Sequence, residues 1–261
     1  MKNNLTILFS LIIVLPMALN AQNTSAFDKE VFIENGDTLK YRILYPKNFD
    51  RDKKYPLVLF LHGAGERGDD NEKQLVHGSH LFLNEENREK FPAIVIFPQC
   101  PEDEYWAKAD IDRSESANVF EFDYSSEPNP ALKKTISLLD SMQTHENVNQ
   151  DKIYLGGLSM GGMGTFELLH RKPNTFAAAI AICGAGDPNS VKNYAQEIDL
   201  WVFHGVEDDV VLPQYSKEMV EALKNEKANV KFTLYPDANH NSWDSAFAEA
   251  DLLPWLFSNS K

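Results

Sequence analysis

Residues 155–162 read LGGLSMGG and place one serine, Ser159, among glycines. A short apolar run precedes the segment and a helix-like stretch follows it, so Ser159 lies where a predicted strand ends and a predicted helix begins. Residues 157–161 match G-x-S-x-G, in which a sharp turn exposes the serine hydroxyl as a nucleophile. The alternative for such a serine is a plain helix N-cap. The pattern and its position together favour the nucleophile.

A serine nucleophile needs a base that a third group holds in place. The chain has seven histidines, and His240 alone lies after the last predicted strand and before the last predicted helix. His62 and His204 each precede a glycine at a strand end, where we expect their backbones to matter most. We therefore predict that His240 is the base. Its alternative is an ordinary histidine of a surface loop.

The acid of such a triad is expected after a strand between the serine and the histidine. Three consecutive acids follow the apolar run 200–203: Glu207, Asp208 and Asp209. A buried carboxylate there would fix the tautomer of His240 and stabilise its charged form. Residue chemistry does not choose among the three. Asp237 is a fourth carboxylate, but it shares the loop of the histidine and is more simply a turn residue.

A glycine-rich segment, HGAGERGDDN, follows the apolar run 57–61. Gly63 and Gly65 leave the backbone amides around Ala64 open to an oxyanion, and the N–H of Met160 is the second predicted donor. A phosphate cradle is the alternative, but the segment matches neither GxGxxG nor GxxxxGK[ST]. The chain also lacks HExxH and CxxC patterns. We predict no metal and no cofactor.

Strands alternating with helices must position these groups. Residues 31–46 predict a β-hairpin around an Asn-Gly turn. Six apolar runs predict parallel strands, at 57–61, 93–97, 152–155, 177–182, 200–203 and 230–235. Helical patterns cover 130–144, 161–171, 214–225 and 242–257. This order predicts an α/β fold with a mostly parallel sheet, helices on both faces, and a site beyond the carboxyl ends of the strands.

The loop 98–129 is longer than most connections and carries several aromatic residues: Trp106, Phe120, Phe122 and Tyr124. We expect it to form a pocket wall, in which Trp106 and the more distant Trp243 contact the substrate. The alternative is an apolar surface patch that folds back on the helices.

The composition describes an ordinary globular chain of 261 residues, 43% of them hydrophobic, with a net charge of −14. This charge disfavours nucleic acids and anionic membranes as partners. Residues 1–21 resemble a signal peptide cut before Gln22, although an uncleaved anchor is the alternative. We expect one secreted or periplasmic catalytic domain at 22–261, with no stable membrane insertion after cleavage. Cys100 and Cys183 are either a disulfide or two buried thiols.

Five segments together resemble one family: LHGAGERGDDN, FPQCP followed by a tryptophan, GLSMGG, HGVEDDVV and YPDANHNSW. They look like secreted α/β-hydrolase esterases of the polyhydroxybutyrate-depolymerase-like, feruloyl-esterase-like and acetyl-xylan-esterase-like group, some of which are labelled predicted peptidases. The resemblance covers roughly residues 30–257. It implies the α/β-hydrolase fold, with Ser159 as nucleophile and His240 as base. It also implies Asp208 as acid, because the family pattern HG-x-x-D-x-x-V places its acid there.

The expected function is that of a carboxylic-ester hydrolase that works through an acyl-serine intermediate. Feruloyl or acetyl esters of carbohydrate are the expected substrates, either as small molecules or linked to polysaccharide. One alternative is a serine peptidase of the same fold, although such peptidases often add a gating domain that this chain has no spare residues to build. The other is an inactive hydrolase fold that binds polysaccharide.

Overall fold

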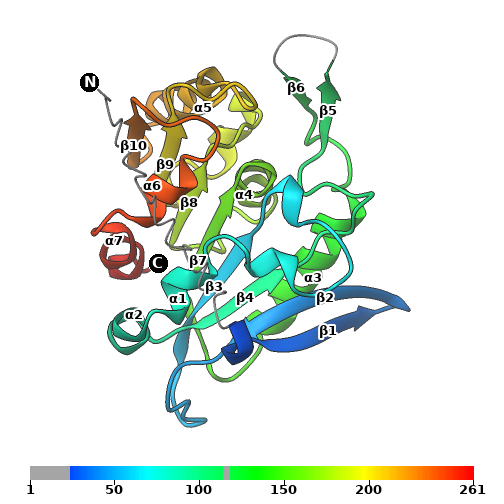
Figure 1. Cartoon of the computed structure of the whole chain (residues 1–261), viewed down its shortest axis with the longest axis vertical. Coiled ribbons are helices and arrows are strands. Elements are labelled where there is room, and N and C mark those ends of the chain that lie inside the picture. The colour runs from blue at the N-terminus through cyan, green and yellow to red at the C-terminus, as the bar shows by residue number, and fades with distance from the viewer. Residues whose placement is uncertain (1–23, 114–117) are drawn as a thin grey trace, which may run out of the picture.

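The computed structural model describes residues 24–113 and 118–261, so the predicted signal peptide lies outside the described residues. Eight strands form one sheet in the order β1-β2-β4-β3-β7-β8-β9-β10 (Figure 1). Their bounds are β1 Asp28–Glu34, β2 Asp37–Leu44, β3 Tyr55–Leu61, β4 Ile94–Pro98, β7 Val148–Leu158, β8 Ala178–Ile182, β9 Asp199–Gly205 and β10 Val230–Tyr235. Within the described residues, no helix has the length and apolar character that crossing a membrane requires.

The predicted hairpin is confirmed as the antiparallel pair β1 and β2. Asn35 and Gly36 join the two strands with φ values of 53° and 87°. Positive φ at both central residues gives the turn the twist that suits a tight hairpin, and asparagine and glycine tolerate it best. Strand β2 also runs antiparallel to β4, whereas the strands from β4 to β10 in the sheet order are parallel to one another.

Helices cover both faces of the sheet, as predicted. Alternate residues of β3 point to opposite faces: Leu57, Leu59 and Leu61 lie in one buried cluster, and Val58 and Phe60 lie in the other. The first cluster also receives residues of α3 (Pro130–Gln143), α4 (Met160–Arg171) and α5 (Pro213–Asn225). The second receives residues of α1 (Ser79–Leu83), α6 (Trp243–Phe247) and α7 (Leu252–Ser258). The fold class is therefore confirmed.

The single helix predicted over 242–257 is wrong, because this segment forms two short helices, α6 and α7. Pro254 stands in the first turn of α7. Proline has no backbone N–H, and its ring would clash with the carbonyl of Ala250 in a continuous helix. The helix therefore has to restart just before Pro254.

The long loop 98–129 contains a two-stranded hairpin, β5 (Ala109–Asp112) and β6 (Val119–Phe122), which projects away from the main sheet (Figure 1). The sequence pattern does not indicate these strands, because each has only four residues and carries acidic side chains. Ile111 and Phe120 are directly opposite each other in the hairpin. Both side chains line the cavity described below.

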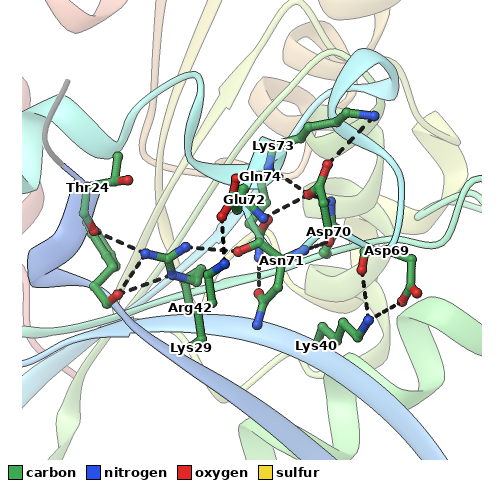
Figure 2. A network of polar contacts seen from close by, with 12 residues as sticks. Thr24, Lys29, Lys40, Arg42, Asp69, Asp70, Asn71, Glu72, Lys73 and Gln74 are labelled. Carbon is green, nitrogen blue, oxygen red and sulfur yellow. Dashed lines mark hydrogen bonds and ion pairs between the residues drawn. The ribbon is translucent and has the colours of Figure 1, made fainter. Parts of the chain in front are cut away.

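A buried polar network fixes the loop that follows β3 (Figure 2). Arg42 of β2 is 4% exposed and donates hydrogen bonds to the carbonyls of Thr24, Phe27 and Asn71. Gln99, which follows β4, accepts a hydrogen bond from the Asn71 N–H at 2.7 Å. Because Arg42 and Gln99 hold the same turn, the loop is fixed against both β2 and the end of β4.

Cys100 and Cys183 are both buried and are not linked to each other. Of the two arrangements that the sequence left open, the structure has the unlinked thiols. Burial raises the pKa of both thiols, so neither is ionised at neutral pH.

Candidate active site

The turn between β7 and α4 places Ser159 in a strained conformation, with φ of 52° and ψ of −119°. The flanking glycines are needed for steric reasons. A Cβ atom on Gly157 would lie 2.2 Å from the carbonyl oxygen of Gly161, and one on Gly161 would lie 2.0 Å from that of Leu61. Any side chain at either position would therefore push the strand and the helix apart. These contacts explain why glycines stand two residues before and two residues after Ser159.

Three predicted residues meet at this turn. The Oγ of Ser159 lies 2.9 Å from Nε2 of His240. On the other side of the ring, Nδ1 lies 2.8 Å from Oδ2 and 3.1 Å from Oδ1 of Asp208. Carboxylate oxygens only accept hydrogen bonds, so Nδ1 carries the proton and Nε2 is free to accept one from the serine. Glu207 and Asp209, the neighbouring acids, are exposed, whereas Asp208 is buried.

Asp208 is held by more groups than the sequence indicates. Its Oδ1 accepts hydrogen bonds from the N–H groups of Val210 and Val211, each at 3.0 Å. Nε2 of His204 lies 3.1 Å from its Oδ2. Burial alone would raise the pKa of Asp208, but the hydrogen bonds from His204 and His240 and the nearby charge of His240 outweigh it and hold the pKa far below the ordinary value. Asp208 is therefore ionised at neutral pH.

The expectation that the backbones of His62 and His204 matter most is wrong, because the side chains of both form hydrogen bonds. His204 is fully buried, and its Nδ1 lies 2.7 Å from the Ser216 hydroxyl. His62 accepts a hydrogen bond from the Cys100 N–H at Nε2, and its Nδ1 lies 2.7 Å from the carbonyl of Gly63. Burial lowers the pKa of His62 to about 4, which keeps the ring neutral. Both rings join strand ends to the loops that carry the site.

The two predicted oxyanion donors each stand at the start of a helix. Ala64 is the first residue of η2 (Ala64–Glu66), and Met160 is the first residue of α4. The first amides of a helix have no acceptor within it, and the helix dipole favours negative charge near them. Ala64 lines the same cavity as Ser159. A Cβ on the intervening Gly63 would lie only 3.7 Å from the Cβ of Ser159, so this backbone approaches the serine closely.

A cavity of about 310 Å³ opens over Ser159 and His240. One wall, here called the polar wall, consists of Glu66, His77 and Trp243. A second wall, here called the hairpin wall, consists of Tyr105, Ile111 and Phe120. Trp243 lines the cavity where the sequence placed it, with its ring centroid 5.5 Å from that of His240.

The expectation that Trp106 contacts the substrate is wrong. Its side chain is fully buried and does not line the cavity. The indole N–H donates a hydrogen bond to the carbonyl of His62 at 3.0 Å, and a Cβ on Gly164 of α4 would lie 2.6 Å from its own Cβ. Trp106 therefore packs against α4 and supports the loop after β3. Its neighbour Tyr105 takes the place in the cavity.

One group in the described residues could hold a metal ion, formed by Cys183, Asp208 and His240 with ligand atoms within 4.8 Å of one another. Asp208 and Nδ1 of His240 are already bonded to each other. A metal bound there would have to displace the hydrogen bond that orients the histidine. The group therefore belongs to the arrangement around Ser159 and is not a separate metal centre.

The model of the phospholipase/carboxylesterase family matches residues 48–251, which is more than half of the chain. Among solved structures, a thermostable esterase superposes with a TM-score of 0.80 at 32% identity, over 91% of this chain and 64% of its own. A ferulic acid esterase from Anaeromyces mucronatus superposes with a TM-score of 0.64 at 18% identity, over 87% of this chain and 89% of its own. At that identity, the second likeness shows the fold alone.

Two curated proteins are similar in sequence. Lysophospholipase-like protein 1 of Mus musculus is 24% identical over 199 residues, which is 70% of this chain and 79% of that protein. A bifunctional acetylxylan esterase/xylanase of Neocallimastix patriciarum is 27% identical over 119 residues, which is 45% of this chain. The matched part spans only 17% of that bifunctional enzyme.

Proposed function

The chain belongs to the phospholipase/carboxylesterase family, and from that premise we propose that it is a serine carboxylic-ester hydrolase. The observation that carries this proposal is the hydrogen-bonded series Ser159, His240 and Asp208, whose serine end opens into the cavity. A plain N-cap serine would not require a strained backbone or a histidine held by a buried anion. Ser159 is the nucleophile, His240 the base and Asp208 the acid.

The reaction runs in two steps. Oγ of Ser159 attacks the ester carbonyl while its proton passes to Nε2 of His240, and the amides of Ala64 and Met160 stabilise the oxyanion. The C–O bond then breaks, and the leaving alcohol takes the proton from Nε2, which leaves an acyl-serine. Water repeats the sequence with the same proton carrier and releases the acid. Asp208 stays ionised throughout and stabilises the imidazolium that forms in each step.

The substrates are feruloyl or acetyl esters of carbohydrate. The cavity supports this because its hairpin wall offers Tyr105 and Phe120, against which an aromatic acyl group can pack. The names of the similar proteins, an acetylxylan esterase/xylanase and a ferulic acid esterase, point in the same direction. The signal-like residues 1–21 support a location outside the cytoplasm, where polymeric esters occur.

Activity assays on the purified protein test this function. Short acyl aryl esters, methyl ferulate, acetylated xylan, a long-chain lipid ester and a peptide are compared for the parent and for Ser159→Ala. We expect hydrolysis of the carbohydrate-type esters, and a loss of about 10⁵-fold or more in kcat for Ser159→Ala, because no acyl-enzyme forms. Ser141→Ala, on the exposed surface of α3, is the matched control and should keep parental activity. A preference for the lipid ester or the peptide would refute the substrate class, and an active Ser159→Ala would refute the mechanism.

A further inference from the structure

We propose that the polar wall, Glu66, His77 and Trp243, is a subsite for the alcohol part of the ester, and that it binds a sugar through neighbouring hydroxyl groups. The inference rests on the proposed ester hydrolysis. It assigns the alcohol part of the substrate to one wall of the cavity, and it names the side chains that distinguish a sugar from a simple alcohol.

The position of His240 determines which wall faces the alcohol. The leaving oxygen takes its proton from Nε2 of His240, so the alcohol must lie on the side of that ring. Trp243 packs edge-on against His240, with ring centroids 5.5 Å apart, and His77 packs against Trp243 at 5.0 Å. Nε2 of His77 lies 3.7 Å from Oε1 of Glu66. The leaving group therefore meets Trp243 first and then the pair Glu66 and His77.

The carboxylate of Glu66 is short of hydrogen-bond donors. Its side chain is only 13% exposed, and in residues 24–113 and 118–261 it has the contact with His77 but no donor at hydrogen-bond distance. A carboxylate that lines the cavity and has no donor from these residues can accept hydrogen bonds from a bound molecule. A Cβ on Gly63 would lie 2.9 Å from Oε2 of Glu66 and 3.7 Å from the Cβ of Ser159. The carboxylate and the nucleophile thus flank the same glycine.

A hydroxyl group fits this pair better than an ammonium group does. A hydroxyl can donate to Glu66 and accept from Nε2 of His77 at the same time, whereas an ammonium group only donates. The ring of Trp243 beside them offers a flat apolar surface for the C–H face of a sugar ring. A carboxylate and a tryptophan that line the same cavity, with His77 in contact with both, therefore favour a sugar over methanol, a lipid alcohol or an amino alcohol.

Two esters with the same acyl group isolate the alcohol subsite. Methyl ferulate and 5-O-feruloyl-L-arabinose form the same acyl-enzyme, so any difference in kcat/KM between them arises before the alcohol leaves. We expect Glu66→Gln to lower the ratio of kcat/KM, arabinose ester over methyl ester, by about tenfold or more, because it loses charge-assisted hydrogen bonds. Glu72→Gln is the matched control, since Glu72 is exposed on the same loop and pairs with Lys29. A ratio that Glu66→Gln leaves within twofold of the parental value would overturn the inference.

Acyl transfer provides a second measurement that does not depend on binding of an intact sugar ester. With methyl ferulate as donor, arabinose and 1-propanol compete with water for the acyl-enzyme. We expect the parent to transfer the acyl group to arabinose in preference to 1-propanol at equal hydroxyl concentration, and Glu66→Gln and Trp243→Leu to lose that preference. Equal transfer to both acceptors, or a Glu66-dependent preference for ethanolamine, would overturn the sugar assignment.

Failure of the proposed function gives a different result from failure of this inference. If the parent hydrolyses acetyl but not feruloyl esters, the same ratio is measured with methyl acetate and acetylated xylose. If it hydrolyses neither class, the proposed function fails. If it hydrolyses the methyl and sugar esters, and Glu66→Gln leaves the ratio of their kcat/KM values unchanged, only the proposal of the subsite fails.

Discussion

The molecule contains two buried polar networks, one within the candidate active site and one that holds the loop after β3. The first surrounds Asp208, whose carboxylate is held by two histidines and two backbone amides. The second surrounds Arg42, whose guanidinium donates to backbone carbonyls alone among the residues that the structure describes (Figure 2). Both satisfy groups that would be expensive to bury unpaired.

The difference between the networks lies in their last members. The Asp208 network ends in His240 and Ser159, whose Nε2 and Oγ atoms lie 2.9 Å apart beside an open cavity. The Arg42 network ends in carbonyl oxygens, which can neither give nor take a proton at neutral pH. The first network can therefore take part in a reaction, whereas the second can only hold a loop in place. Mutations in the two networks should affect different measurements.

Among substitutions of the charged groups in the two networks, Asp208→Asn should have the largest effect. An asparagine would offer His240 the wrong hydrogen-bond partner, so we expect kcat/KM to fall by about 10⁴-fold, with folding retained. Asp209→Asn and Glu207→Gln should cost less than about fivefold, because both side chains are exposed. Steady-state kinetics on one ester measures all three. A larger loss at Asp209 than at Asp208 would contradict the assignment of the acid.

Arg42→Met should act on stability instead. It removes the Arg42 donor from the carbonyls of Phe27 and Asn71 and one of two donors from that of Thr24. The gain from removing a buried charge offsets only part of that loss. We expect the free energy of unfolding to fall by about 2–3 kcal/mol, measured by urea denaturation.

The kinetics of Arg42→Met test the division between the two networks. In conditions where the variant is folded, kcat/KM should stay within about fivefold of the parental value. Lys40→Met, next to Arg42 on the same strand, is the control, because Lys40 pairs with the exposed Asp69 and should cost under about 1 kcal/mol. A loss of activity as large as that of Asp208→Asn would show that the loop network takes part in the chemistry.

His204→Phe tests whether the second histidine positions Asp208. It removes the donor next to Oδ2 of Asp208. The carboxylate would then attract the protonated form of His240 more strongly, because one of its hydrogen-bond partners is gone. We expect kcat/KM to fall by about tenfold and the acid limb of its pH profile to move to higher pH. His204→Gln keeps an N–H donor and should restore part of both effects. An unmoved pH profile in His204→Phe would leave His204 with a purely structural role.

The smallest expected effect is that of Asp70→Asn in the Arg42 region. Burial raises the pKa of Asp70, but hydrogen bonds from the Lys73 N–H, the Gln99 side chain and the Glu72 N–H lower it to about 2. Because the pKa in the folded state is below the unfolded value of about 3.9, Asp70 contributes stability above pH 4 and loses it as the pH falls through about 2.

The pH dependence of unfolding distinguishes this effect from a general loss of packing. Asp70 is 37% exposed, so solvent screening reduces the expected difference from the parent to about 1 kcal/mol at pH 6. That difference should shrink at pH 3. A difference that is the same at both values would contradict the role given to the ionised carboxylate.

Much of the fold followed from local patterns. The Asn-Gly turn identified the first hairpin, and the apolar runs located six of the parallel strands, because buried strands are marked by short apolar stretches between turns. Strands β5 and β6 escaped detection, since four residues with acidic side chains do not stand out from a loop. Pro254 was a readable helix break that the prediction of one helix over 242–257 overlooked.

The sequence by itself determined that a serine stands on a glycine-flanked turn between a strand and a helix, because that motif is local and its sterics involve a few adjacent residues. It left three acids open, and the family resemblance indicated Asp208. Only the tertiary structure showed that Asp208 is buried between two histidines while its neighbours point to solvent.

The same holds for the cavity. Tyr105 and Trp106 are adjacent in the sequence, yet of these two residues Tyr105 lines the cavity and Trp106 is buried. An irregular loop has no repeating pattern of side-chain directions, so its sequence does not indicate which residue faces the cavity. Glu66 and Trp243 are far apart in the chain, and their places on one wall depend on where the loop after β3 packs against α6. Side-chain type and local backbone are properties of short segments, whereas burial and neighbourhood depend on the packing of the whole sheet and its helices.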